Sequence, residues 1–394
     1  MRYLAVLGRQ PKISLAELES LFSDVMPLGP DLATFSSNSE PNISRLGGTV
    51  KLAREITEKP EQYLLELEYS GKIVLGISDY SKNATSKKSQ YLALKIKRIL
   101  KSHGKNVRVL QNKSSVLSSA TTFHNQLGEK PGHLELIKYG NRYFELIGVQ
   151  NINSYRDRDQ NRPARDAKVG MLPPKLAQIL INLCGPLQSN TRILDPFCGT
   201  GVVLQEALLM GYSVYGTDAS ERMVEYTKRN LDWLNAIFKA HLEETTHQKS
   251  ASKKEATLFT REGVSEKSIV EIGDATDFTW KQPIDAVACE TYLGPPMSEP
   301  PADIKLKTVE QECRTIIVNF LKNLSTQIKS GTPVAIAVPA WLRPDGTYYH
   351  LKILDELEKL GYNVKKYNNL SQKDLLYHRD DQIVAREIIV LRKK

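Results

Sequence analysis

The sequence predicts an α/β protein whose C-terminal half is a Rossmann-like sheet of parallel strands joined by helices. Two observations support this fold class. First, apolar runs of strand length alternate with helical runs after residue 173, and four of the strand-like runs finish at an acidic residue. Second, the earliest of them turns through two glycines into a helix, as nucleotide-binding corners of α/β proteins do.

This corner spans residues 195–201, Asp-Pro-Phe-Cys-Gly-Thr-Gly, and lies between the apolar pair Ile193-Leu194 and a helical run over 202–210. Its glycines permit backbone conformations and close approach that a Cβ would obstruct. The helix N-terminus offers free N–H groups to a ligand. A dinucleotide site requires G-x-G-x-x-G, and no third glycine follows Gly201 on schedule. The corner therefore favours S-adenosylmethionine over a dinucleotide.

Three further strand-like runs, over residues 213–218, 269–272 and 284–289, also finish at acids. These acids are Asp218, Asp274 and Glu290. Ligands of open α/β sheets bind outside the carboxyl ends of the strands, so these three side chains and Asp195 are expected to converge on one cleft. Asp218 stands where such folds place the acid that accepts hydrogen bonds from both ribose hydroxyls.

The composition of the 394 residues, with 41% hydrophobic and 25% charged, is that of a globular protein of two or three domains. No apolar run approaches the roughly 18 to 20 residues that span a bilayer, and the N-terminus lacks a secretory pattern, which predicts a cytoplasmic protein. The four cysteines form no C-x-x-C pair, and the seven histidines show no metal-ligand spacing. We therefore expect no metal and no disulfide framework.

The net charge of +9 falls entirely within residues 1–168, which hold 26 basic and 17 acidic residues, whereas residues 169–394 hold 28 of each. Ten basic residues and no acidic one lie between positions 80 and 113. Apolar residues recur there at helical spacing, at Leu92, Ile96, Ile99 and Leu100. A helix in this stretch would bury one face and expose a cationic one, which predicts binding to a polyanion through its phosphates.

Residues 151–172 are polar, contain proline and are rich in arginine, as expected of a linker that also touches a ligand. The arginines of this segment either support a displaced nucleic-acid strand or form a solvated hinge; they are Arg156, Arg158, Arg162 and Arg165. A helix is predicted from Pro173-Pro174 to Leu183. Residues 241–267 are nearly all polar and are predicted to form a mobile insertion.

Four segments carry a family resemblance: GRQPKISLAELE at residues 8–19, Arg162-Pro163 followed by GMLPPKLA at 170–177, the corner at 195–201, and HRDDQIVAREI at 378–388. With them the chain resembles, nearly end to end, the THUMP-domain tRNA guanosine N2-methyltransferases. These are the archaeal-type enzymes that methylate a guanosine in the D-arm region, and their eukaryotic relatives. The Arg-Pro approach coupled to the corner is fairly specific to this group.

The resemblance implies a ferredoxin-like plus THUMP module of α+β type that grips tRNA over residues 1–150, and the linker 151–172. It implies a class I methyltransferase domain over residues 173–394, with the insertion 241–267 inside it. The sheet of that domain would have seven strands, the last antiparallel. The fifth strand would be Pro333–Val338, and the final pair Val364–Leu370 and Ile383–Leu391.

The resemblance also assigns site residues. Those that would bind S-adenosylmethionine are Asp195, Phe197, Gly199, Thr200, Gly201, Asp218 and Asp274. Asp195 would face the amino-acid end of this cofactor, Asp218 the ribose, and Asp274 the adenine amino group. The candidate RNA contacts are Lys87, Lys88, Lys95, Arg98, Lys101, Arg156 and Arg162.

The acceptor segment departs from the pattern of amino-directed methyltransferases, which carry D/N-P-P-Y after the fourth strand. In that pattern a side-chain oxygen and a backbone carbonyl accept the N–H bonds of the amine, and the aromatic ring stacks on the base. Here Glu290 replaces Asp or Asn, Thr291 stands in place of the first proline, and Tyr292 comes one residue early. We expect Glu290 and the Thr291 carbonyl to hold the amine and Tyr292 to stack. Glu290 could also accept the proton that the amine loses.

Three other functions compete with this interpretation. A DNA amino-methyltransferase would use the same corner and acceptor groups, but no target-recognition repeat is visible. A noncatalytic RNA-binding protein with a retained cofactor pocket would explain the altered acceptor segment. A dehydrogenase is disfavoured by the missing glycine fingerprint. We expect a monomer that binds tRNA and no membrane, and a small activator protein is compatible with the sequence.

Overall fold

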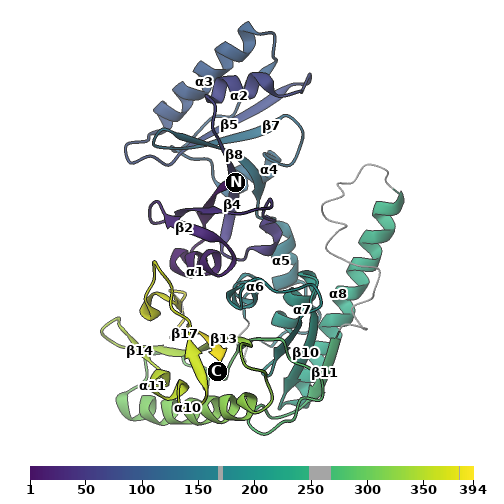
Figure 1. The fold of residues 1–394 in the computed structure, drawn as a ribbon, viewed down its shortest axis with the longest axis vertical. Helices are drawn as coiled ribbons and strands as arrows, with labels where there is room; N and C mark the ends of the chain where they lie inside the picture. Colours follow the sequence, from purple (N-terminus) through teal and green to yellow (C-terminus); the bar gives the residue numbers. More distant parts are fainter. Residues whose placement is uncertain (167–171, 248–267, 381) are drawn as a thin grey trace. The chain divides into compact units, whose positions relative to one another are not determined.

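The computed structural model describes residues 1–166, 172–247, 268–380 and 382–394, and the chain divides into two compact units, Met1–Tyr155 and Arg156–Lys394 (Figure 1). Helix α5 (Ile152–Gln160) crosses the boundary between them. Unit 1 holds 21 basic and 14 acidic residues, and unit 2 holds 33 and 31, so most of the excess positive charge belongs to unit 1. In the described part of the chain, no helix is both long and apolar enough to cross a membrane.

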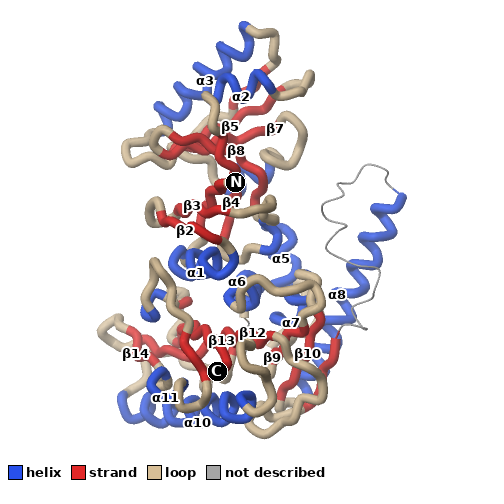
Figure 2. Tube along the Cα trace, viewed as in Figure 1, coloured by secondary structure: helices blue, strands red, loops and turns tan. Residues whose placement is uncertain are grey.

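Unit 1 is built on one eight-stranded mixed sheet in the order β2-β3-β1-β4-β8-β7-β5-β6, which Figure 2 draws in red. Its strands are β1 (Arg2–Leu7), β2 (Ser23–Pro27), β3 (Leu32–Ser36), β4 (Thr49–Ile56), β5 (Ile73–Asp79), β6 (Val107–Val109), β7 (His133–Tyr139) and β8 (Arg142–Val149). Its helices are α1 (Pro11–Leu21), α2 (Pro60–Glu66), α3 (Ser86–Ser102) and α4 (Ser119–His124), and η1 (Ile43–Arg45) is a 3-10 turn. Unit 1 is thus of α+β type, and its assignment as a ferredoxin-like and THUMP module stays a prediction.

Helix α3 confirms the amphipathic helix predicted between residues 80 and 113. Thr85 caps its N-terminus by accepting a hydrogen bond from the Lys88 N–H at 3.2 Å. Its buried face carries Ala93, Ile96 and Leu100, which pack with residues of β5. The opposite face is therefore left to the cationic side chains.

A buried polar cluster joins three strands and α4 inside unit 1. Lys51 of β4 donates to Glu135 of β7 at 2.6 Å, and both side chains are almost fully buried. Glu135 also accepts hydrogen bonds from Ser78 of β5 and Thr122 of α4. Burial lowers the pKa of Lys51, and Glu135 opposes that shift. The carboxylate is stable in the core because three donors satisfy it.

Unit 2 contains a nine-stranded sheet whose main path is β11-β10-β9-β12-β13-β17-β15. Its strands are β9 (Arg192–Asp195), β10 (Ser213–Asp218), β11 (Ser268–Ile272), β12 (Ala286–Glu290), β13 (Pro333–Leu342), β14 (Tyr348–His350), β15 (Tyr362–Val364), β16 (Leu376–Tyr377) and β17 (Val384–Lys393). The strands from β9 to β13 are parallel, and β17 runs antiparallel to β13. The main path confirms the predicted Rossmann-like sheet of seven strands with an antiparallel last strand, and β14 and β16 are two short additional strands that pair with β13 and β17.

Two predicted elements of unit 2 were placed wrongly, and β13 extends four residues beyond the predicted fifth strand, Pro333–Val338. The sixth strand is β15, which ends at Val364, whereas the prediction began there and ran to Leu370. Within β15, Tyr362 and Val364 are apolar residues on the same face of the strand. The next five residues, Lys-Lys-Tyr-Asn-Asn, lack the alternation of apolar and polar side chains that a half-buried strand needs. Residues 241–247, which were predicted to belong to the insertion, are part of helix α8 (Glu221–His247). The rest of that prediction, 248–267, lies outside the described residues.

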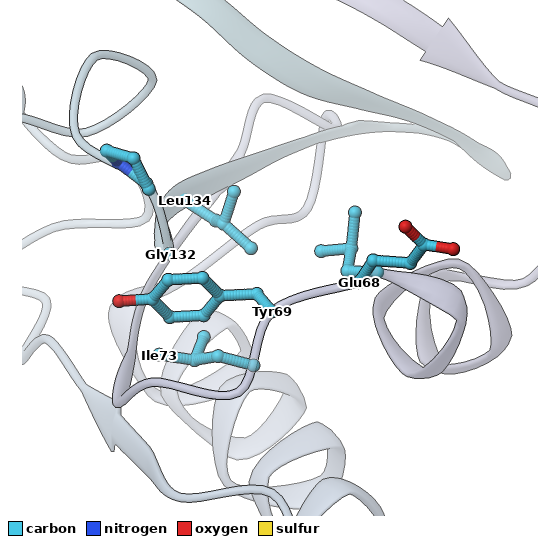
Figure 3. Close-up of a pocket in the computed structure, with 7 residues that line it drawn as sticks. Glu68, Tyr69, Ile73, Gly132 and Leu134 are labelled. Atoms are coloured by element: carbon cyan, nitrogen blue, oxygen red, sulfur yellow. The ribbon is translucent and has the colours of Figure 1, made fainter.

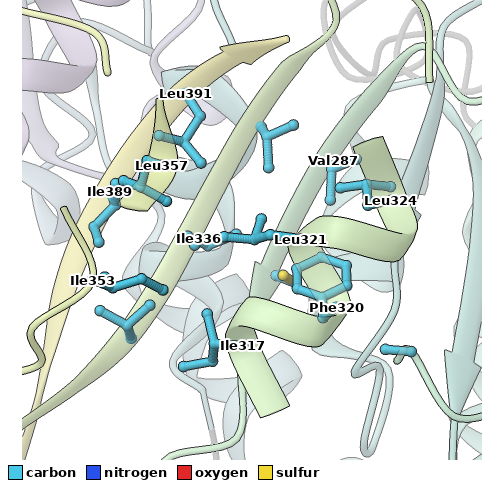
Figure 4. Close-up of a cluster of buried hydrophobic side chains, with 14 of the residues drawn as sticks. Val287, Ile317, Phe320, Leu321, Leu324, Ile336, Ile353, Leu357, Ile389 and Leu391 are labelled. Atoms are coloured by element: carbon cyan, nitrogen blue, oxygen red, sulfur yellow. The ribbon is translucent and has the colours of Figure 1, made fainter. Parts of the chain in front are cut away.

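Helices cover both faces of the unit 2 sheet. These helices are α6 (Pro174–Leu183), α7 (Val202–Leu209), α8, α10 (Asp303–Ser325) and the short α11 (Leu354–Leu357), with η3 (Gln372–Asp374) as a 3-10 turn. Figure 4 shows Ile317, Phe320 and Leu324 of α10 pointing at strand residues that include Val287 and Ile336. On the other face, Gly216 of β10 lies against Leu204 of α7. The carboxyl ends of the strands are thereby held at one edge.

Candidate cofactor and acceptor site

The predicted corner is the β9–α7 loop, and its two glycines have the conformations that the prediction required. Gly199 has φ of +51° and Gly201 has φ of +80°, in the left-handed region that favours glycine. A Cβ at Gly201 would also lie 2.8 Å from the Thr227 Cγ2. Gly201 caps the N-terminus of α7. A ligand can therefore approach the backbone of this loop closely, next to the free N–H groups at the start of α7.

Asp218, at the end of β10, holds this loop in place. Its Oδ2 accepts the Gly199 N–H at 2.9 Å and its Oδ1 accepts the Ser220 N–H at 2.9 Å. Burial raises the pKa of the Asp218 carboxyl, and these two N–H groups oppose the shift. A carboxylate has about four acceptor positions, so two remain for a ligand.

Asp195 is the most buried acid of the corner, with only 2% of its surface exposed. Its Oδ1 accepts the Phe197 N–H at 3.1 Å. Burial raises the pKa of Asp195 well above its usual range, and the nearby carboxylates Asp218 and Glu290 raise it further. Three acids thus lie close enough to repel one another, which makes the site attractive to a cationic ligand.

Asp274 lies on the same edge, in the exposed loop after β11. Its Oδ1 accepts from both the N–H and the hydroxyl of Thr276, at 2.9 and 2.8 Å. The preceding Gly273 donates its N–H to the Asp218 backbone carbonyl at 3.0 Å, which brings the ends of β10 and β11 together. The four strand-end acids are therefore at one edge of the sheet, as the sequence predicts.

Glu290, the last residue of β12, is ion-paired with Arg386 of β17. The Arg386 Nε donates to Glu290 Oε1 at 2.5 Å, and the two side chains are 5% and 15% exposed. Arg386 also donates to the Gln382 Oε1 at 3.2 Å. The sequence analysis missed this pair, because the two residues are separated by one strand in the sheet and by 96 positions in the chain.

Thr291 is anchored to β13, and its carbonyl lies opposite a proline. Its N–H and its hydroxyl both donate to the Ala337 carbonyl at 3.0 Å. In a parallel ladder the next bond would run from the N–H of residue 339 to the Thr291 carbonyl. Residue 339 is Pro339, which has no N–H. The ladder ends there, and the Thr291 carbonyl is left without its sheet donor.

Tyr292 turns towards α10 and away from the Glu290 side of the sheet. Its hydroxyl donates to Glu312 Oε1 at 3.3 Å, and its ring packs against the cluster beneath α10. Cys289 belongs to the same cluster, so the alternation of side chains along β12 places Glu290 on the other face. The Glu290 and Tyr292 side chains therefore lie towards different faces of the sheet, and the expected stacking of Tyr292 on the base stays a prediction.

The predicted RNA contacts differ in exposure. Lys87, Lys88, Lys95, Arg98 and Lys101 are all exposed on α3, and Arg156 is exposed on α5. The sequence analysis missed two apolar side chains on the same face of α3, Tyr91 at 69% and Leu94 at 40% exposure. Arg162 is only 3% exposed, which does not fit a direct contact with RNA. Arg158 donates to the buried Glu206 at 2.7 Å and so ties α5 to α7.

A pocket of about 200 Å³ lies in unit 1, between the start of β5 and the loop before β7. Figure 3 shows the Tyr69 ring next to Gly132, where a Cβ would come within 2.2 Å of the ring. Its lining contains none of the predicted cofactor or acceptor residues. Among the described residues, no group of three or more acidic, histidine or cysteine side chains could hold a metal ion.

Residues 162–307 match the family of RMKL-like methyltransferase domains. The tRNA (guanine(10)-N2)-dimethyltransferase of Methanothermobacter thermautotrophicus is 29% identical over 173 residues, which cover 44% of this chain and 40% of that protein. The enzyme of the same name from Pyrococcus abyssi is 50% identical over 62 residues, covering 16% and 18%. The matches thus span less than half the length of these curated relatives. The crystal structure of TrmN from Thermus thermophilus aligns over both full chains with a TM-score of 0.44 and 14% identity. The sequence matches confirm the resemblance to tRNA guanine N2-methyltransferases over part of the chain, and its predicted extent over nearly the whole chain stays a prediction.

Proposed function

We propose that this chain, which is related through residues 162–307 to the RMKL-like methyltransferase domains, is an S-adenosylmethionine-dependent tRNA methyltransferase acting on the N2 amine of a guanosine. The observation that carries the proposal is the edge where Asp195, Asp218 and Glu290 meet beside the glycine loop. The names of the sequence relatives point to guanine 10 as the target. A tRNA substrate implies action in the cytoplasm, and we propose a monomer.

The cofactor site fits S-adenosylmethionine. This molecule carries a positively charged sulfur and an ammonium group, and Asp195 is buried close to two further acids, Asp218 and Glu290. Asp195 would face the amino-acid end, and the spare acceptor positions of Asp218 would take the ribose hydroxyls. Gly199 and Gly201, which have no Cβ, would let the cofactor approach the loop backbone closely, with Phe197 and Thr200 beside them, and Asp274 would accept from the adenine amine. When bound, the cofactor supplies an electrophilic methyl group.

The acceptor site would hold the guanine amine by two oxygens. Glu290 would accept one N–H, and the Thr291 carbonyl, which Pro339 leaves without a sheet donor, would accept the other. An exocyclic amine is a poor nucleophile, so fixing its orientation is the main contribution that such a site can make. Tyr292, with its hydroxyl held by Glu312, would supply a ring against the base. A paired guanosine would have to leave its stack to reach these groups.

A second candidate function is favoured by one observation. The tether between Tyr292 and α10 is compatible with a noncatalytic tRNA-binding protein that retains the cofactor pocket. In such a protein the acceptor segment would be only a strand-to-loop turn.

Methyl transfer separates the two functions. Labelled methyl from S-adenosylmethionine is supplied to unmodified tRNA, and the nucleosides are analysed by mass spectrometry. We expect label on the N2 of guanosine and, with mapped fragments, on guanine 10. Binding of both tRNA and cofactor without labelled nucleoside would instead support the noncatalytic function.

A further inference from the structure

The inference concerns how Glu290 is oriented, and it rests on the proposed function. Glu290 has one methylene more than the Asp or Asn of the amino-directed pattern. A longer side chain has more rotamers, so its carboxylate needs an additional constraint to face an amine reproducibly. Arg386 supplies such a constraint, since its Nε lies 2.5 Å from Glu290 Oε1 and both groups are largely buried.

The sheet register explains how Arg386 reaches Glu290. Glu290 pairs with Ala337, and Pro339, two residues further along β13, pairs with Arg386. All four residues therefore point to the same face of the sheet. The strands β12 and β17 flank β13, so they are about 9.6 Å apart, which is two strand spacings. The small side chain of Ala337 leaves the space over β13 through which the arginine extends.

Arg386 donates a hydrogen bond to one carboxylate oxygen of Glu290, and a second residue holds the guanidinium in place. Its second hydrogen bond goes to the Gln382 side chain, so the guanidinium is held at two points. Among the described residues, no hydrogen bond is recorded to Glu290 Oε2. We propose that Arg386 is a positioning residue, which holds Glu290 through Oε1 and presents Oε2 to the acceptor amine. Arg386 acts through Glu290 and does not contact the reacting atoms.

The test compares three substitutions in the full-length protein. Arg386→Ala is expected to lower kcat for tRNA methylation by about 100-fold, because a misplaced positioning group has an effect of this size. Its affinity for S-adenosylmethionine should be unchanged. Millimolar ethylguanidinium should restore part of the lost turnover, which it cannot do for a general folding defect. Arg386→Lys retains the charge without the planar fork and should lose about 10-fold.

Glu387→Gln is the matched control. Glu387 is the next residue on β17, lies on the opposite face and is equally buried in its own pair with His350, at 2.9 Å. This substitution neutralises a buried, hydrogen-bonded carboxylate on the same strand, so it should lower the melting temperature and leave kcat unchanged. A fall in kcat equal to that of Arg386→Ala would indicate a structural role for Arg386 and overturn the inference.

A double-mutant cycle with Glu290→Gln completes the test. If Arg386 acts through Glu290, its removal should add less than about twofold to the defect of Glu290→Gln. Full additivity would refute the inference while leaving the methyltransferase activity established. Absence of methyl transfer by the unsubstituted protein would instead remove the proposed function itself. Should Arg386→Ala not fold, the Arg386→Lys and Glu290→Gln cycle gives the same decision.

Discussion

At the residue scale, the chemistry of the candidate site is set by the contrast between satisfied and unsatisfied buried charges. Glu290 has a buried arginine beside it, whereas Asp195 has a single backbone N–H and two neighbouring acids. Burying a carboxylate without a cation is costly, so the folded protein without ligand carries a penalty at Asp195.

This penalty predicts that Asp195→Asn stabilises the ligand-free protein. Because the pKa of Asp195 is raised on folding, its ionised form destabilises the folded state, so the cost appears as pH rises above the unfolded value of about 3.9. The stabilisation of the folded state by the substitution should thus be absent at low pH and grow towards neutral pH. Each kcal/mol of added unfolding free energy should raise the melting temperature by about 2–4 °C. Cofactor affinity should fall. Melting curves without ligand between pH 4 and pH 8 test this. Asp277→Asn, in the exposed loop after β11, should show no such trend.

The Lys51–Glu135 pair in unit 1 predicts the opposite kind of effect. Lys51→Met leaves Glu135 buried without its cation, which typically costs about 3–5 kcal/mol of unfolding free energy. Lys95→Met breaks a pair with Glu61 whose lysine is 56% exposed, and it should cost about 0–1 kcal/mol. Urea unfolding followed by a probe in unit 1 measures both. Equal losses for the two substitutions would show that the buried pair makes no special contribution.

The acids and ion pairs of unit 2 show which parts of the candidate site could be predicted from the sequence and which could not. Asp195, Asp218, Asp274 and Glu290 were found because each follows an apolar run, and strand ends share an edge. Arg386 could not be assigned to Glu290, because that requires knowing that both flank β13 and which residues share a face. The contact of Tyr292 with α10 could not be predicted from the sequence either, because tertiary packing sets the direction of a side chain that follows a strand end.

At the scale of elements, the end of the β12–β13 ladder at Pro339 is the feature most closely tied to the acceptor site. Proline in a central strand removes a ladder hydrogen bond, so it is tolerated where the unpaired carbonyl is useful or solvated. In this sheet the unpaired group is the Thr291 carbonyl.

Pro339→Ala should restore the missing N–H and extend the β12–β13 ladder. The new donor would compete with the guanine amine for the Thr291 carbonyl, which should cost about 1.4 kcal/mol, or tenfold in kcat. Hydrogen exchange should show a protected amide at residue 339. Pro344→Ala, in the exposed turn after β13, is the control and should change neither quantity. A protected amide with unchanged kcat would exclude the Thr291 carbonyl as an acceptor of the amine.

Elements whose sequence is strongly patterned were predicted well, and weakly patterned ones were not. β9, β10, β11 and α6 lie within one residue of their predicted runs, because each has an apolar stretch bounded by turn residues or by prolines, whereas β12 begins two residues later than predicted. β15 has three residues and depends on its pairing with β17, so the sequence carries little local signal for it. α8 continues into a polar stretch that pattern reasoning assigned to the insertion.

At the scale of the whole molecule, the charge is divided unequally between the two units. Unit 1 has an excess of seven positive charges and unit 2 an excess of two. The exposed face of α3 concentrates five cations around Tyr91, a side chain that could stack on an unpaired base. This distribution predicts that unit 1 supplies most of the electrostatic affinity for RNA.

Replacing Lys87, Lys88, Lys95, Arg98 and Lys101 by Gln should weaken tRNA binding and flatten its salt dependence. Each lost phosphate contact lowers the slope of log K against log salt by about 0.7–0.9. Binding titrations between 50 and 200 mM salt measure this. The control removes the same number of exposed positive charges from unit 2, at Lys305, Lys307, Lys322, Lys329 and Lys359. If the control flattens the slope equally, α3 has no special part in RNA binding.

The crowding of Asp195, Asp218 and Glu290 has a consequence for turnover. If S-adenosylmethionine binds here as proposed, loss of its methyl group to the guanine amine would leave a neutral sulfur, and the attraction between that sulfur and the surrounding acids would be lost. The same carboxylates would therefore bind the demethylated product less tightly than they bind the cationic cofactor. We expect the acidic edge of the sheet to favour exchange of the demethylated product for a new S-adenosylmethionine molecule, and so to limit inhibition by the product.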